Sequence, residues 1–226
     1  MDREELNHYL RQNTPREKEF LSGISMEELR RRDVEKYPRA GQEAYLFEGC
    51  QFMAPGEKLV VSRQDRYIEV LPHKHDYIEL CYVWSGTCQQ TIEGRKVETR
   101  QGDMCIFDTQ AVHSIDAGGE NDIVVNILMR KEFFDGAFLS RMPGQGIVSE
   151  FLADSVTKSR KKRHYLLFHS RKNPRVHDIM EHIMMEYYTE DIGMREVLES
   201  YVIILFTELL RTWRDETREQ AAVSQE

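Results

Sequence analysis

The sequence predicts a mainly β protein with helices, in which a sandwich or barrel of short strands is followed by an antiparallel two-helix hairpin. Two observations carry this prediction. Between residues 49 and 135, short apolar runs are separated by Gly, Asp and Asn at intervals of roughly 8–12 residues, which is typical of an all-β sandwich or barrel. Between residues 173 and 216, apolar residues recur instead at helical spacing.

Residues 1–48 are predicted to form a helical N-terminal arm. Thr14-Pro15 suits an N-cap followed by a first-turn proline, and Ser25 with Glu28 has the spacing of a capping box. We interpret the charged stretch from Glu27 to Arg32 as a solvated helix face.

Residues 49–135 are predicted to form the β domain. Glu93-Gly94 is a two-residue hairpin signal, because glycine readily takes the positive φ that such a turn needs. The expected strands are Lys58–Ser62, Tyr67–Leu71, Tyr77–Trp84, Cys88–Ile92, Lys96–Thr99, Met104–Asp108 and Ile123–Met129.

Residues 136–172 are predicted to be a mixed connecting region with a basic loop. A basic run of this kind is usually a solvated loop, and the alternative is docking against an acidic neighbour or DNA in a larger assembly. Its basic residues are Lys158, Arg160, Lys161, Lys162, Arg163, Arg171 and Lys172.

Residues 173–216 are predicted to be the helical hairpin, and residues 217–226 a polar tail. Asn173-Pro174 makes a good N-cap and first turn, and Gly193 separates the two helices. The segment Tyr201–Phe206 is apolar nearly all round, so its helix needs a second partner besides the β domain. A homodimer seam is the expected use of that surplus surface.

Composition excludes several classes of protein. The chain of 226 residues has 31 basic and 39 acidic side chains, a net charge of −8, which argues against a nucleic-acid-binding surface as its main feature. No run approaches the ~20 apolar residues of a membrane span, and the charged N-terminus is unlike a signal peptide. The cysteines form no C-x-x-C pair and are expected to be reduced, in a cytoplasmic protein; they are Cys50, Cys81, Cys88 and Cys105.

The chemistry-bearing residues gather around residue 75. His73, His75 and Glu79 have the same parity, so in one regular strand they would share a face, with Tyr77 and Cys81 between and after them. His113 lies beyond a later strand and could approach from across the barrel. Glu79 is expected to favour the protonated imidazoles, which would make the pocket mildly pH-sensitive. Weaker candidates for ligand contact are Asn121, Asp122 and Asn126.

Two functions suit His73, His75, Glu79 and His113. Imidazoles with one carboxylate can hold a divalent metal such as Zn, Fe, Mn or Ni. The same four residues, with Tyr77, could instead form hydrogen bonds with an organic effector. No further acid–base residue is evident beside them, so no catalytic residue is assigned.

The motifs around these residues resemble those of cupins. The spacing His73-x-His75-x3-Glu79-x6-Gly86 matches the first cupin motif from its first histidine onward, and Gly102 followed by His113 matches the frame of the second. The sequence departs from the pattern at Tyr67, Asp108, Gln110 and Ala117. The resemblance implies a cupin-like double-stranded β-helix, or jelly roll, with its ligand site in the barrel mouth.

A narrower resemblance is to the N-terminal sensor half of AraC-type transcription regulators. It covers roughly residues 50–215 and rests on PHKHDYIELCYVWSG, on GDMCIFDTQAVHSI and on the helical hairpin. It implies a non-enzymatic domain that binds a sugar-like or other polar metabolite and forms a homodimer through residues 173–216. DNA would be contacted only by a C-terminal helix-turn-helix domain that this sequence lacks. The alternative is a small metal-dependent cupin enzyme, such as an oxygenase, isomerase or lyase.

Overall fold

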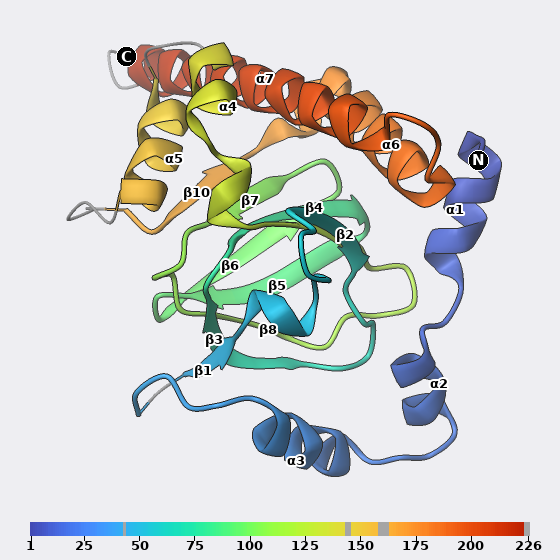
Figure 1. Cartoon of the computed structure of the whole chain (residues 1–226). Coiled ribbons are helices and arrows are strands. Elements are labelled where there is room, and N and C mark those ends of the chain that lie inside the picture. The colour runs from blue at the N-terminus through green and yellow to red at the C-terminus, as the bar shows by residue number, and fades with distance from the viewer. Residues whose placement is uncertain (43, 143–145, 158–162, 224–226) are drawn as a thin grey trace.

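The computed structural model of the chain describes residues 1–42, 44–142, 146–157 and 163–223. Two five-stranded sheets pack face to face between helices at both ends of the chain (Figure 1). In spatial order, the first sheet contains β1 (Tyr45–Phe47), β3 (Val70–His75), β8 (His113–Ile115), β5 (Thr87–Ile92) and β6 (Arg95–Arg100). The second contains β10 (Tyr165–Phe168), β7 (Met104–Phe107), β4 (Ile78–Ser85), β9 (Ile123–Met129) and β2 (Leu59–Arg63).

Neighbouring strands are antiparallel, apart from β1, which runs parallel to β3. The predicted cupin-like jelly roll is confirmed. Three strands were not predicted: β1 and β8 have three residues each, too few to show an alternating pattern, and β10 lies in the region expected to be mixed. The strand predicted at Tyr67–Leu71 is wrong, because Tyr67 has φ 64° and β3 begins at Val70.

Strand β4 is buried on both of its faces. Cys81 and Val83 face the interior between the sheets, where they pack in a cluster with Cys88, Cys105 and Phe107. Ile78, Leu80, Tyr82 and Trp84 face outward and pack against the helices. The Tyr82 hydroxyl lies 2.8 Å from Nδ1 of His177, which also stacks on Trp84, so β4 is fastened to the helical layer.

That helical layer consists of α6 (Pro174–Thr189) and α7 (Met194–Val223), which pack against each other on the second sheet (Figure 1). Residues 217–223 of the expected polar tail are helical, because α7 continues to Val223. No helix within the described residues is both long and apolar enough to cross a membrane.

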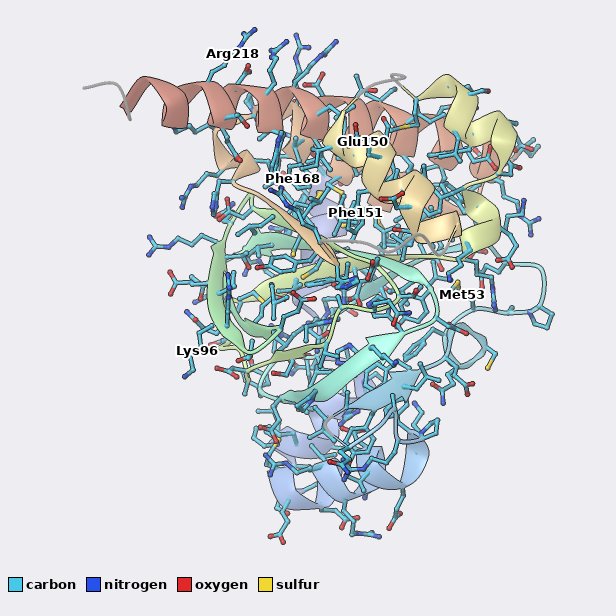
Figure 2. The ribbon with its side chains drawn as sticks, turned by 90° about the vertical axis from the view of Figure 1, so that its left-hand side faces the viewer. Met53, Lys96, Glu150, Phe151, Phe168 and Arg218 are labelled. Atoms are coloured by element: carbon cyan, nitrogen blue, oxygen red, sulfur yellow. The ribbon has the colours of Figure 1, made fainter. Side chains whose placement is uncertain are left out.

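Two short helices of the connecting region cover α7 from a second side. They are α4 (Gly136–Arg141) and α5 (Ile147–Thr157). The Phe206 ring lies 6.2 Å from that of Phe134 and 6.4 Å from that of Phe138, and Figure 2 shows Phe151 and Phe168 between the sandwich and α7. The inference that α7 needs another molecule to cover its surplus apolar surface is therefore wrong for much of that surface.

Part of the predicted basic loop, residues 158–162, lies outside the described residues. Among its described members, Arg163 lies over the Trp213 ring at 5.8 Å. Arg171 packs so closely on Gly102 that an added Cβ would lie 2.7 Å from the Arg171 Cα, which explains the glycine at that turn.

The N-terminal arm wraps around the sandwich from α6 to the opposite end (Figure 1). Its helices are α1 (Arg3–Arg11), α2 (Pro15–Leu21) and α3 (Met26–Lys36), and they begin at the N-caps Asp2, Thr14 and Ser25. At α6, Arg3 donates to both carboxylate oxygens of Glu181, at 2.5 and 2.6 Å, beside the fully buried Leu6.

A buried ion cluster anchors the middle of the arm. Glu17 of α2 is fully buried and accepts hydrogen bonds from the Arg63 guanidinium at 2.9 and 2.8 Å. It also accepts from the Arg66 backbone N–H at 2.6 Å and from the Arg66 guanidinium. Burial would raise the pKa of Glu17, but the hydrogen bonds from Arg66 and Arg63 win and lower it to about 2. The arm is thus fastened by charge rather than by apolar packing alone.

Replacing Glu17 by glutamine should destabilise the protein by about 3–5 kcal/mol, because two buried guanidinium groups lose their counter-charge. Urea unfolding monitored by circular dichroism measures this loss. The matched control is Glu19→Gln, whose exposed carboxylate pairs with Arg32 at 3.0 Å and should matter far less. Equal stability of the two variants would show that the cluster does not anchor the arm.

Candidate functional site

The predicted site residues come together, but not along one strand. His73 and His75 belong to β3 in the first sheet, whereas Glu79 belongs to β4 in the second. The chain passes between the sheets at Asp76 and Tyr77, where Asp76 Oδ1 accepts the Gly49 N–H at 2.7 Å. The expectation of one regular strand is therefore wrong; the change of sheet turns Glu79 toward the imidazoles.

His113 completes the group from β8, directly opposite His73 in the strand register. The centroids of the His73 and His113 rings lie 4.1 Å apart, and those of His75 and His113 lie 5.6 Å apart. Glu79 Oε2 lies 3.2 Å from Nε2 of His75 and 3.7 Å from Nε2 of His113. All four side chains are buried.

Backbone contacts fix the orientation of two imidazoles. Nδ1–H of His73 donates to the Leu71 carbonyl at 2.8 Å, and Nδ1–H of His75 donates to the Tyr77 carbonyl at 2.6 Å. In the neutral ring this leaves the lone pair on Nε2, the pattern seen in metal-binding histidines. His113 stacks on Phe107 at 4.1 Å.

Burial makes two of these histidines hard to protonate. It lowers the pKa of His73 to about 4, outweighing the opposite effect of Glu79, and it lowers that of His113 well below the ordinary range. Glu79 does favour the protonated form of His73, as expected, but the desolvation of that ring outweighs the nearby charge.

The donor set fits a divalent metal ion. One ligand atom from each of His73, Glu79 and His113 lies within 4.8 Å of the others. Both ring nitrogens of His113 and Nε2 of His75 are buried without a hydrogen-bond partner among the described residues. His73, Glu79 and His113, with His75 beside them, would hold the ion, which when bound supplies Lewis-acid chemistry.

A cavity of about 250 Å³ opens beside this cluster, between the barrel mouth and the N-terminal arm. His73, Tyr77 and Glu79 line it, whereas His75 and His113 lie behind its wall. The arm contributes Arg16, Asp33 and Tyr37. The remaining lining residues are Phe47, Phe52, Ser62, Arg63, Gln64, Asp65, Ile68, Glu69, Val70, Ile115, Asn126 and Leu128.

Sequence reasoning missed most of this lining. The contribution of the arm leaves no local signal, because residues 16–37 are separated from residues 73–79 in the chain and meet them only in the fold. In the sequence, Phe47 and Phe52 cannot be told apart from ordinary core residues. Asn126, a weaker candidate, does line the cavity, whereas Asn121 and Asp122 do not.

Comparison with known families agrees with this geometry. A family model described as the AraC-like ligand binding domain matches residues 60–202. The chain belongs to this family. The matched part of this AraC-like domain contains all four residues of the histidine–glutamate cluster, while the arm that closes the cavity precedes it.

The solved structures that match the chain do so at low sequence identity. An apo ToxT structure from Vibrio cholerae is 11% identical at a TM-score of 0.49, and the match covers 69% of this AraC-like chain and 56% of ToxT. KdgF from Halomonas sp. is 23% identical at a TM-score of 0.30, over 32% of this chain and 69% of KdgF. An RmlC-like cupin from Shewanella frigidimarina is 17% identical at a TM-score of 0.28, over 32% of this chain and 66% of the cupin.

The match thus spans little more than half the length of ToxT. No curated protein matches the chain.

The depressed pKa of His73 predicts a pH-dependent stability. A folded pKa of about 4 lies below the ordinary 6.5, so the stabilisation is complete above pH 6.5 and is lost as the pH falls toward 4. In chelator-treated protein, His73 should account for a loss of about 3 kcal/mol across this range.

The His73→Asn variant keeps an N–H donor for the Leu71 carbonyl but removes the titrating ring. Urea unfolding at pH 7 and pH 4.5 should give a smaller difference for this variant than for the wild type. The same difference in both proteins would show that His73 is not held neutral.

Proposed function

We propose that the chain is a non-enzymatic, effector-binding domain of an AraC-type transcription regulator, acting in the cytoplasm. The observation that carries the proposal is the cavity between barrel and arm, in which a small molecule would contact His73, Tyr77 and Glu79 of the barrel together with the arm. DNA would be contacted by a helix-turn-helix domain other than residues 60–202. The effector is a polar metabolite, sugar-like or otherwise.

The arm supports this proposal because it links the cavity to the helical layer. Arg16, Asp33 and Tyr37 line the cavity, whereas Arg3 of the same arm is bound to Glu181 of α6. A ligand that prefers one position of the arm would therefore shift the population of arm and helix arrangements together.

Homodimerisation through residues 173–216 is a second element of the proposal. Although α4 and α5 cover much of α7, Ile204 remains 47% exposed, and the Tyr201 ring stacks on His182 of α6 at 5.5 Å on a partly exposed face. An apolar side chain on such a face gains stability when a second copy covers it.

The metal-dependent cupin enzyme is the alternative, and the ligand-type geometry of His73, Glu79 and His113 favours it. The cavity supports the effector role more strongly, because three residues of the arm line it together with those of the barrel.

Effector binding predicts thermal stabilisation by a member of a metabolite library. A ligand at 100 times its Kd should add about 2.7 kcal/mol to the free energy of unfolding, measured by differential scanning fluorimetry. Asn126→Ala should weaken binding about tenfold, because its amide lines the cavity, while the exposed Asn121→Ala serves as the matched control.

Two outcomes would contradict the effector proposal. One is that no compound of the library stabilises the protein. The other is about one metal ion per chain by elemental analysis, lost in Glu79→Ala, together with turnover of a bound compound; this would favour the enzyme.

Dimerisation predicts that Ile204→Glu lowers the molecular mass measured by light scattering from a dimer to a monomer, because a charge would enter the apolar seam. The matched control is Ile192→Glu, since Ile192 is 99% exposed in the loop between α6 and α7. A dimer that survives Ile204→Glu would place the seam elsewhere.

A further inference from the structure

We propose that the cavity takes a small organic ammonium ion, an amine with an aromatic or other apolar body. This inference rests on the proposed effector-binding function and names the chemical class of the effector. Three independent observations support it: an aromatic wall, an excess of carboxylates, and a buried acceptor without a partner.

The aromatic wall is built from Tyr37, Phe47, Phe52 and Tyr77. The ring centroids of Tyr37 and Phe47 lie 4.0 Å apart, and Phe52 lies 6.0 Å from both Phe47 and Tyr77. Aromatic faces attract organic cations, and they bind quaternary ammonium ligands in many proteins. The Nζ of Lys36 lies 4.7 Å from the Tyr37 centroid and 5.9 Å from that of Phe52, so a ligand ammonium would use the ring faces that Lys36 leaves free.

The charges of the lining favour a cation over an anion. The carboxylates Asp33, Asp65, Glu69 and Glu79 outnumber the guanidinium groups of Arg16 and Arg63. Both guanidinium groups are already bound to carboxylates, Arg16 to Asp33 and Arg63 to Glu17. An anionic ligand would be desolvated with no unpaired cation in the described lining to compensate for it. Glu69 is likewise bound to Arg30 outside the lining, so the lining charges that remain are those of Asp33, Asp65 and Glu79 against Arg16. Without Glu79, Asp65 remains beside the Arg16–Asp33 pair.

Asn126 supplies the acceptor. Asn126 is only 7% exposed and lines the cavity, and its buried Oδ1 has no hydrogen-bond partner among the described residues. Buried acceptors without partners are rare, and an ammonium N–H would satisfy this one. Among the described residues, the Nε of Arg16 is a second buried lining atom without a hydrogen-bond partner, and it would donate to an oxygen of the same ligand, while the Arg16 charge stays paired with Asp33.

A matched series of probes tests the charge class directly. The probes are 2-phenylethylamine, 2-phenylethanol and 3-phenylpropanoate, which share an aromatic body and are cationic, neutral and anionic at pH 7. Isothermal titration calorimetry uses the full chain after chelator treatment, because a metal ion at His73, Glu79 and His113 would repel the amine. The amine should bind about tenfold more tightly than the alcohol, and the carboxylate most weakly.

Two variants test the residues that carry the argument. Phe52→Leu keeps an apolar side chain but removes the π-face, and should weaken amine binding about three- to thirtyfold with little effect on the alcohol. Asp65→Asn removes one charge and can still accept the Thr14 hydroxyl, which lies 2.6 Å from Asp65 Oδ1; it should also weaken only the amine. The control is Asp135→Asn at the N-cap of α4, where asparagine caps equally well.

Equal or tighter binding of the alcohol or the carboxylate would overturn the ammonium proposal. If Asn126→Ala also weakened the binding of the alcohol or the carboxylate, the effector function would be supported and only the proposed ligand class would be wrong. Failure of the amine to bind would likewise overturn this proposal, whereas the metabolite library decides the effector function separately.

Discussion

The buried ion cluster of Glu17, Arg63 and Arg66 is the contact on which the cavity depends. A fully buried carboxylate must have counter-charges, and here they come from β2 and the segment that follows it. Because their geometry is fixed, α2 can lie in only one place, and α3 is then led over the barrel mouth. The two arm helices place Arg16, Asp33 and Tyr37 in the cavity wall. The pocket therefore depends on the attachment of the arm as well as on the barrel.

The histidine–glutamate cluster and the cavity are adjacent but distinct. His73 and Glu79 belong to both, whereas His75 and His113 contribute only to the cluster. Burial holds His73 and His113 neutral, and neutral rings suit either metal binding or hydrogen bonding. The four residues can therefore join the two sheets, while only His73 and Glu79 would contact a ligand in the cavity.

The spacing of apolar runs and turn residues predicted a sandwich or barrel of short strands, and the resemblance to cupin motifs implied the jelly roll. The grouping of His73, His75 and Glu79 was expected from their parity in one strand, but it arises from the change of sheet between β3 and β4. The start of β3 was misplaced, since the positive φ of Tyr67 is one that its residue type does not favour. The cover on α7 and the arm side of the cavity were also missed. Both depend on contacts between distant segments, such as Phe138 with Phe206, which no periodicity reveals.

Strand β4 constrains how the specificity of this pocket could change. One of its faces is packed in the barrel and the other against the helices, so a new side chain at almost any position would disturb the core. The half-buried lining residues Phe52, Gln64 and Asp65 have more room. Redesign of the protein as a biosensor for another compound would therefore begin in the loops that border the cavity and leave the sheet that forms its floor unchanged.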